Sequence, residues 1–305
     1  MRRPPPLRPG DAVAVVAPAS APRDPDRYRD GLARLRELYD VRRAWTPNSP
    51  RGYLSGPDPE RAVALNEAVA DPAVRALFCV RGGYGSLRLL ADLDWAQARE
   101  HPTLLVGYSD ITALHLAYHS RAGWTGVSGP VVTEWAVLDE QTLGPFRRLV
   151  EGGTPALGDE AARPMRPGTA TGPLLGGNLS VLSRLVGTSY APAWEGAILV
   201  LEDVAEAPYR VDRMLSHLQH AGILDAVGGV VLGDFRVGPD EPDPPSLSLQ
   251  TVFADYLDTR PYPVATHLHY GHRLPRCSLP VGSPVRLTVS SDAVELRAAA
   301  PVVEP

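Results

Sequence analysis

Short apolar runs alternate with longer helical stretches along the first half of this chain. Residues 12–17 (AVAVVA) and 75–80 (RALFCV) have the length and composition of buried strands. Residues 26–38 and 61–69 instead repeat their apolar positions with the period of a helix. Strands that alternate with helices at this spacing predict an α/β fold built on a doubly wound parallel sheet.

The second half of the chain has a mixed pattern. Apolar runs at 197–201 and 229–232 predict strands, and residues 211–220 predict a helix. Residues 284–296 alternate apolar and polar side chains, which is typical of a β-hairpin with one face in water. We therefore expect a second domain with both parallel and antiparallel strands.

The two patterns are separated by a stretch rich in proline, glycine and charge, as linkers often are. We predict an amino-terminal α/β domain at 1–150, a linker at 151–170 and a carboxyl-terminal domain at 171–305. A chain of 305 residues is long enough for two domains, and a hydrophobic fraction of 44% is ample for two buried cores.

The charge composition excludes several classes of function. The net charge is −5, and all 30 basic residues are arginine. Without lysine there is no Schiff base, no phosphate-binding lysine of the Walker type and no Ser-Lys dyad. No basic cluster stands out, so we expect no nucleic-acid partner.

Cysteine usage and the apolar pattern indicate in which cellular compartment the protein is expected. Cys79 and Cys277 are far apart and form no CxxC motif, so neither a disulfide framework nor a zinc knuckle is expected. The basic amino terminus is not followed by an uninterrupted apolar stretch, and no apolar run has transmembrane length. We expect a cytoplasmic protein that does not contact the membrane.

Ser109 is the strongest candidate for a nucleophile. It follows the apolar run 104–106 at a sharp turn and precedes an amphipathic helix expected over 111–118. Such a turn lifts a hydroxyl out of the backbone and aims the first amides of the helix at the group that the serine attacks. The alternative is a helix N-cap, a common role for Ser or Asp before an apolar helical run.

A catalytic serine needs a base, and His272 is the best candidate. It follows Gly271 at the end of an apolar segment, where catalytic side chains of α/β folds collect. His267 and His269 would share one face of a strand, which invites a metal site, although no carboxylate or thiolate can be assigned beside them. The other histidines lie in a loop or in helical stretches, where we expect structural roles: His101, His115, His119, His217 and His220.

The carboxylate that orients the base is expected to be Glu202. It is the first polar residue after the apolar run that ends at Leu201. Glu206 is a rival, but its neighbourhood favours pairing with Arg210 or Arg213 at the start of a helix. The order Ser, Glu, His matches that of α/β-hydrolases, yet their elbow has glycine two residues after the serine, where this chain has isoleucine.

Here the chain resembles the serine LD-carboxypeptidases (peptidase family S66), which include microcin C immunity peptidases. The matching segments run nearly end to end, at residues 17–20 (APAS), 81–85 (RGGYG), 107–110 (GYSD), 176–179 (GGNL), 201–203 (LED), 208–215 (PYRVDRML), 233–235 (GDF) and 271–272 (GH). The resemblance implies a flavodoxin-like amino-terminal domain and a swivelling β/β/α carboxyl-terminal domain, with the site between them. It assigns the triad to Ser109, Glu202 and His272, and it suggests a homodimer.

The glycine turn offers further site residues. An oxyanion would lie between the backbone amides of Asp110 and Gly83, since glycine permits close approach of the backbone to substrate. Arg81 is the candidate for binding a terminal carboxylate, which a planar guanidinium suits. The alternatives for this turn are a tight connection between strand and helix or a phosphate cradle, although the spacing fits no P-loop or Rossmann motif.

The resemblance implies release of terminal D-alanine from a murein tetrapeptide during cell-wall recycling, without a cofactor. Hydrolysis of a peptidyl-nucleotide antibiotic is the alternative within the family. Outside it stand an α/β-hydrolase esterase and a non-catalytic peptide-binding protein. The third residue of the peptide (diaminopimelate, ornithine or lysine) is left open.

Overall fold

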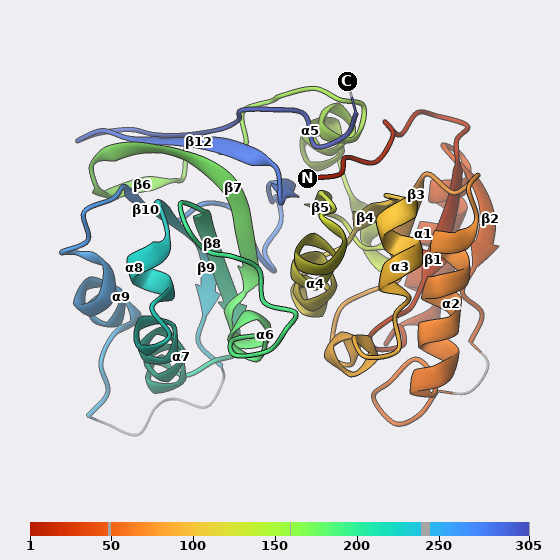
Figure 1. Cartoon of the computed structure of the whole chain (residues 1–305), viewed down its shortest axis with the longest axis horizontal. Helices are drawn as coiled ribbons and strands as arrows, with labels where there is room; N and C mark the ends of the chain where they lie inside the picture. The colour runs from red at the N-terminus through yellow and green to blue at the C-terminus, as the bar shows by residue number, and fades with distance from the viewer. Residues whose placement is uncertain (48–49, 159, 239–244, 305) are drawn as a thin grey trace. The chain divides into compact units, whose positions relative to one another are not determined.

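The computed structural model describes residues 1–47, 50–158, 160–238 and 245–304, and the chain divides into two compact units, each built on its own sheet (Figure 1). Unit 1 comprises residues 1–153, 278–282 and 301–305, and unit 2 comprises residues 154–277 and 283–300. Two short segments near the carboxyl terminus thus pack in unit 1, although they lie within the sequence range 171–305.

Unit 1 contains a six-stranded sheet in the order β11-β5-β4-β3-β1-β2. Its strands are β1 (Ala12–Val16), β2 (Asp40–Ala44), β3 (Ala76–Cys79), β4 (Leu104–Val106), β5 (Gly126–Ser128) and β11 (Leu279–Val281). The first five run parallel, and β11 pairs antiparallel with β5. The order 2-1-3-4-5 is that of flavodoxin, and in such sheets ligands bind at the carboxyl ends of the strands.

Two groups of helices accompany this sheet. The helices are α1 (Pro25–Arg36), α2 (Asp58–Ala70), α3 (Trp95–Glu100), α4 (Thr112–Ala122) and α5 (Glu140–Val150), with 3-10 turns η1 (Ser86–Leu89), η2 (Ser109–Ile111) and η3 (Val132–Val137). α2, α3 and α4 pack in succession, whereas α1 packs on η3. Trp135 of η3 and Phe146 of α5 meet Phe78 of β3 edge to face, which forms an aromatic core.

α4 differs from its prediction. An amphipathic helix was expected over 111–118, but all eight of these residues are buried. The helix contacts β5, α3 and η1. Its Tyr118 ring stacks on Trp124, with ring centroids 4.2 Å apart, and meets Trp95 of α3 edge to face. A helix that is covered on several sides has no solvent-exposed face, so its sequence need not be amphipathic.

Unit 2 contains a seven-stranded sheet in the order β13-β12-β7-β8-β9-β10-β6. Its strands are β6 (Arg163–Arg166), β7 (Gly168–Asn178), β8 (Ile198–Val204), β9 (Gly229–Arg236), β10 (Val264–Thr266), β12 (Pro284–Val289) and β13 (Val294–Ala298). The strands β7 to β10 are parallel, and the flanking strands β6, β12 and β13 are antiparallel to their neighbours. The mixed sheet and the hairpin expected over 284–296 are confirmed.

The helices of unit 2 are α6 (Leu179–Ser183), α7 (Pro208–His220), α8 (Ile223–Ala226) and α9 (Leu249–Leu257). α7 packs against α6, α8 and α9 and is the centre of this layer (Figure 1). The segment predicted as a linker, 151–170, contains β6 and the first residues of β7, because polar and proline-containing strands at a sheet edge lack the apolar signature of a central strand.

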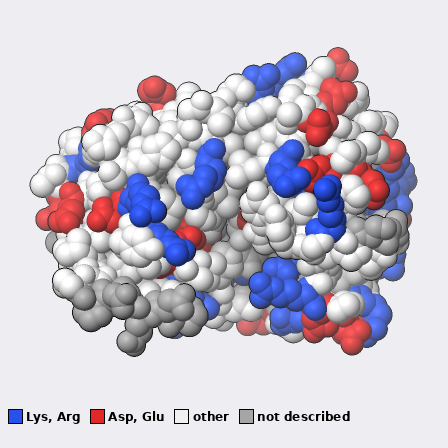
Figure 2. Space-filling view, turned by 90° about the horizontal axis from the view of Figure 1, so that it is seen from below, with Lys and Arg blue, Asp and Glu red and all other residues white. Residues whose placement is uncertain are grey.

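No helix of the described residues is long and apolar enough to span a membrane. On the face drawn in Figure 2, arginines and carboxylates are interspersed and no single sign of charge covers the surface. This distribution agrees with the small net charge of −5.

Candidate functional site

Ser109 lies at a strained turn in unit 1. Its backbone has φ of 64°, in the left-handed region that side chains other than glycine rarely adopt. The residue follows β4 and opens η2, so the hydroxyl stands at the carboxyl end of a central strand. The serine therefore does not have the extended backbone of a typical N-cap residue. Such strain persists only where the surroundings fix it, and it is frequent at active sites.

The surroundings of Ser109 are fixed by hydrogen bonds on both sides. The ring of His115 contacts the Gly107 carbonyl at 2.9 Å, and the hydroxyl of Tyr108 donates to Glu134 Oε1 at 2.8 Å. His115 is buried in α4, and burial lowers its pKa to about 4, so the ring is neutral near pH 7. It is the structural histidine that the sequence suggested.

The glycine turn after β3 approaches the serine closely. A Cβ atom built on Gly82 would lie 2.8 Å from the Cβ of Ser109 and 3.1 Å from its Oγ. Any side chain at position 82 would thus displace the serine. A Cβ on Gly83, whose φ is 111°, would lie 2.5 Å from Ser20 Oγ. Close approach to Ser109 and to Ser20 therefore excludes a side chain at both glycines.

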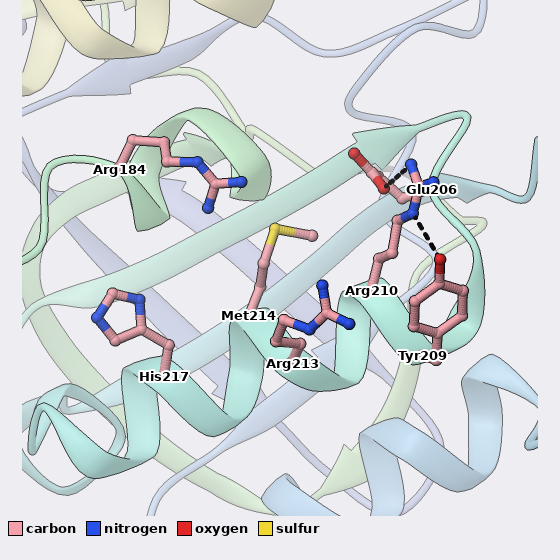
Figure 3. A pocket seen from close by; sticks show the side chains of 7 residues that line it. All are labelled: Arg184, Glu206, Tyr209, Arg210, Arg213, Met214 and His217. Carbon is pink, nitrogen blue, oxygen red and sulfur yellow. Dashed lines mark hydrogen bonds and ion pairs between the residues drawn. The ribbon is translucent and has the colours of Figure 1, made fainter.

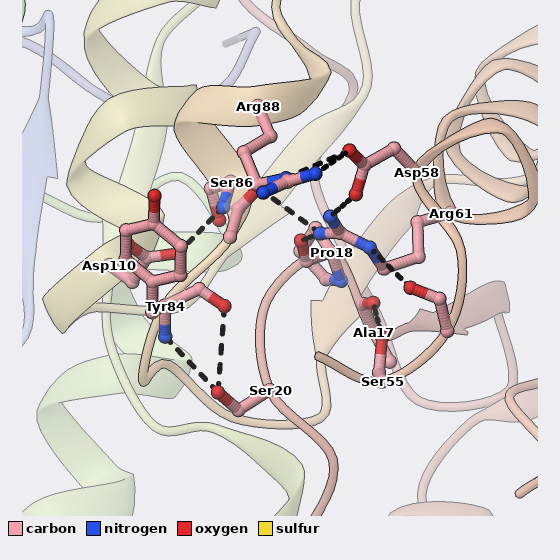
Figure 4. A network of polar contacts seen from close by, with 12 residues as sticks. Ala17, Pro18, Ser20, Ser55, Asp58, Arg61, Tyr84, Ser86, Arg88 and Asp110 are labelled. Atoms are coloured by element: carbon pink, nitrogen blue, oxygen red, sulfur yellow. Dashed lines mark hydrogen bonds and ion pairs between the residues drawn. The ribbon is translucent and has the colours of Figure 1, made fainter. Parts of the chain in front are cut away.

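Asp110 links this turn to the serine through its side chain. The buried carboxylate accepts a hydrogen bond from the backbone N–H of Ser86 at 2.8 Å, across the gap between the two loops (Figure 4). Burial raises the pKa of Asp110. The sequence assigned Asp110 only a backbone role, because a carboxylate beside a serine does not reveal which distant N–H it accepts.

Arg61 is a second side chain that links the loops of this site, and the sequence did not reveal this role. Its side chain is buried, and it donates to the carbonyls of Gly56 and Gly85 at 3.1 Å and to that of Pro18 (Figure 4). It also pairs with Asp58 at 2.5 Å. One guanidinium therefore joins the loops after β1 and β3. A single arginine in the predicted helix at 61–69 gave no sign of this role.

The turn also carries Arg81. Its guanidinium is half-buried and donates to the Ala21 carbonyl at 3.3 Å. Burial, and the nearby Arg23, lower its pKa from the usual value. Its Nη2 atom lies 3.5 Å from the position that a Cβ on Gly83 would occupy. The positive charge of Arg81 therefore lies beside the glycine turn that approaches Ser109.

His272 and Glu202 form a hydrogen-bonded pair in unit 2. His272 Nδ1 lies 2.8 Å from Glu202 Oε2. The glutamate is 1% exposed, whereas the histidine side chain is 21% exposed. Gly271, with φ of 137°, permits this contact, because a Cβ there would lie 3.0 Å from Glu202 Oε2. The sequence placed Glu202 just past its strand, but β8 extends to Val204, so the glutamate lies within the strand.

A register shift lies at the two consecutive carboxylates of β8. The pairing of β8 with β9 shifts between Leu201 and Asp203, so the alternation of faces is interrupted at Glu202. Glu202 and Asp203 are both buried, at 1% and 3% exposure, as are the four residues of β8 before them. Apolar periodicity cannot report such a bulge, because it depends on the partner strand.

Asn178 holds the two carboxylates in place. It is the register partner of Glu202 on β7, and its Nδ2 atom donates to Glu202 Oε1 and to Asp203 Oδ1, each at 3.1 Å. Asp203 also accepts from the backbone N–H groups of Val204 and Ser180 at 2.8 Å. Burial, with a smaller effect of Glu202, raises the pKa of Asp203 to about 6. Asn178 was missed as a site residue, although it lies in the GGN sequence.

The remaining candidates are placed differently. Glu206 lies past the end of β8 and pairs loosely with Arg210, at 3.5 Å, as the sequence suggested. The expectation that His267 and His269 share a strand face is wrong: β10 ends at Thr266, and His267 has φ of 60° on an exposed loop. Among the described residues, no three His, Cys, Asp or Glu side chains are grouped so as to hold a metal ion.

Comparisons with known proteins identify matching families and folds. Residues 13–129 match the LD-carboxypeptidase N-terminal domain, and residues 171–287 match the LD-carboxypeptidase C-terminal domain. The chain is 34% identical over 303 residues to a probable murein peptide carboxypeptidase of Bacillus subtilis, covering 97% of this chain and 94% of that protein.

Two solved structures are similar over nearly the whole chain. One is a muramoyltetrapeptide carboxypeptidase from Oxalobacter formigenes, with a TM-score of 0.83 and 28% identity over 94% of this chain and 98% of that one. The other is an MccF-like protein from Bacillus anthracis, with a TM-score of 0.87 and 26% identity over 97% and 99% of the two chains.

The left-handed backbone at position 109 has a measurable effect on stability. We expect Ser109→Gly to exceed Ser109→Ala in free energy of unfolding by about 1 kcal/mol, because only glycine adopts this φ without strain. In the control, Ala64→Gly on the exposed face of α2, glycine should cost about 1 kcal/mol. Urea unfolding of the variants measures both differences. An alanine variant as stable as the glycine variant would contradict the strain.

Asp203 makes stability depend on pH. Its folded pKa of about 6 lies above the ordinary value of 3.8 for an aspartate, so the folded state binds the proton more tightly, and this contribution to stability is lost as pH rises from about 4 to 6. Two pKa units correspond to about 3 kcal/mol. Unfolding of wild type and Asp203→Asn at pH 4 to 7 should show wild type losing stability relative to the variant. Parallel pH curves would refute this.

Proposed function

This chain belongs to the LD-carboxypeptidase family, and we propose that it is a serine carboxypeptidase that cleaves the bond between an L-centre and a terminal D-residue. The observation that carries the proposal is the hydrogen bond of 2.8 Å between His272 Nδ1 and Glu202 Oε2. It leaves Nε2 as the nitrogen that can accept a proton. Ser109, raised on a strained turn, supplies a hydroxyl that needs such a base.

The proposed cycle uses these three residues as one triad. Ser109 Oγ attacks the scissile carbonyl while His272 Nε2 takes the hydroxyl proton, and Glu202 stabilises the resulting imidazolium. His272 then gives the proton to the leaving amine, which departs as D-alanine. Water attacks the acyl-enzyme with His272 again as base, and this releases the shortened peptide and restores the serine.

Electrostatic stabilisation of the oxyanion is assigned to backbone amides. We assign the amides of Asp110 and Gly83 to this role, since each lies in a loop that the contacts around Ser109 hold rigid. Arg81 is assigned to the terminal carboxylate, which distinguishes an exopeptidase substrate from an internal peptide bond. Its guanidinium over the glycine turn supports this assignment.

The proposed substrate is a murein tetrapeptide, processed in the cytoplasm during cell-wall recycling by a homodimer without a cofactor. The names of the relatives from B. subtilis and O. formigenes support this substrate. The likeness to an MccF-like protein supports a second candidate, a peptidyl-nucleotide antibiotic. Assay of both substrates with the purified protein separates the two.

Replacing the nucleophile tests the mechanism directly. We expect Ser109→Ala to lower kcat for D-alanine release by several orders of magnitude, because loss of a triad nucleophile removes the covalent route. Substrate binding should persist, since the hydroxyl contributes to chemistry rather than to the core. Release of D-alanine is measured by a coupled oxidase assay, and binding by calorimetry. Near wild-type turnover would eliminate the proposed nucleophile.

Replacing the carboxylate tests the other half of the triad. A general base acts only when it is unprotonated, so kcat/KM should fall at low pH. A neighbouring carboxylate favours the imidazolium, and its neutralisation in Glu202→Gln should move this acid limb to lower pH. The same variant should lower kcat sharply, because the orienting charge is lost.

Two control variants identify which acid sets the profile. Glu206→Gln should keep the acid limb where it is, since Glu206 contacts Arg210. Asp203→Asn should also retain the acid limb of the pH profile, because Asp203, whose pKa is about 6, is not the proposed base. If the limb moves in Glu206→Gln and stays in Glu202→Gln, Glu202 is not the third triad member.

A further inference from the structure

The loop that follows β1, residues 17–20 (APAS), has no part in the proposed triad, yet buried polar groups hold its backbone. Its first three carbonyls each accept a hydrogen bond, from the Ser55 hydroxyl at 2.5 Å, from Arg61, and from the Ser55 N–H at 3.0 Å (Figure 4). Ser55 and Arg61 are both buried. The last residue of the loop, Ser20, is therefore presented from a fixed backbone.

Ser20 contacts the glycine turn after β3 through both its backbone and its side chain. Its N–H donates to the Gly82 carbonyl at 3.4 Å. Its hydroxyl accepts from the Tyr84 N–H at 3.2 Å and donates to the Tyr84 carbonyl at 3.5 Å (Figure 4). Ser20 thus binds the residue before Gly83 and the residue after it.

These contacts restrict the orientation of the Gly83 amide. Glycine is the residue whose backbone rotates most freely, and Gly83 has φ of 111°. In a trans peptide the carbonyl of one residue and the N–H of the next point in opposite directions. The bond from Ser20 to the Gly82 carbonyl therefore directs the Gly83 N–H away from the loop 17–20. The Ser20 hydroxyl fixes the peptide plane on the other side of Gly83.

The rest of the turn is held in the same manner. Ser20, Arg61 and Asp110 each bind one of the three successive residues 84, 85 and 86. The three side chains come from the loop after β1, from α2 and from η2, and all three are at most 9% exposed. Asp110 also supplies the second backbone amide that we assign to the oxyanion. Both amides therefore belong to one hydrogen-bonded network.

We propose that the Ser20 side chain is a positioning residue of the oxyanion hole, which acts by fixing the direction of the Gly83 N–H. This role rests on the proposed function, which assigns that amide to the oxyanion. Ser20 acts through Tyr84 and not on the substrate, because its hydroxyl is buried and already accepts and donates a hydrogen bond. Negative charge develops on the scissile oxygen only in the transition state, so the effect should fall on kcat rather than on KM.

Replacement of the Ser20 hydroxyl tests this role. Removal of an oxyanion donor lowers kcat by about 100-fold to 1,000-fold, so a misdirected donor in Ser20→Ala should lower kcat for D-alanine release by about 10-fold to 100-fold. KM should stay within about twofold of wild type. Ser20→Thr retains the hydroxyl and should restore most of kcat. The matched control is Ser283→Ala, which removes a buried hydroxyl that donates to the Ala300 carbonyl at 3.3 Å in unit 2 and should leave kcat unchanged.

The split between kcat and KM distinguishes positioning from a merely structural role. A wild-type kcat in Ser20→Ala would overturn the proposal. So would an equal loss in Ser283→Ala, or a loss confined to KM. Should circular dichroism show that Ser20→Ala is unfolded, Ser20→Cys takes its place, because a thiol has nearly the same volume but is only a weak donor and acceptor. The same outcomes then decide.

Reaction with a fluorophosphonate separates this proposal from the proposed substrate. The reagent forms a bond between Ser109 Oγ and phosphorus, releases fluoride and passes the hydroxyl proton to His272, without recognition of a peptide. Its rate constant should fall at least about tenfold in Ser20→Ala, since the phosphonyl oxygen uses the same amides. If wild type reacts but releases no D-alanine, the peptide substrate is wrong and this rate constant still decides the role of Ser20. If wild type does neither, the nucleophile and the role of Ser20 are both wrong.

Discussion

The left-handed backbone at Ser109 is the constraint on which the rest of unit 1 depends. A serine at φ of 64° costs energy that a relaxed loop would release. The fold retains this strained conformation because hydrogen bonds hold the loop on both sides of the serine. The Gly107 carbonyl contacts the ring of His115, and the carboxylate of Asp110 accepts from the N–H of Ser86. The close approach of Gly82 follows from the same constraint, since the strained turn brings the serine against a neighbouring loop.

The arrangement in unit 2 solves a different physical problem. A base needs a buried carboxylate partner, but burial favours the neutral acid. The amide of Asn178 donates to one oxygen of Glu202 and leaves the other oxygen to His272. The adjacent Asp203 is also buried, and burial raises its pKa to about 6 although the carboxylate accepts three N–H groups. Burial contributes more to this shift than the neighbouring Glu202 does.

The sequence predicted features that depend on local pattern and failed where tertiary contacts decide. The parallel sheet, the hairpin and the turn at Ser109 follow from residues adjacent in the chain. The burial of α4 does not, because its neighbours come from elsewhere. Arg61 and Asn178 were missed because each acts through partners far away in sequence.

The absence of lysine shapes both units in the same way. A buried ammonium readily gives up its proton, whereas a guanidinium stays charged and presents donors in several directions. Arg61 uses this property to reach three carbonyls and one carboxylate at once, which a lysine with a single nitrogen would not match in geometry. At Arg184 and Arg213 the planar fork faces a pocket beside α7 instead of a loop (Figure 3). Both uses depend on donors that are fixed in one plane.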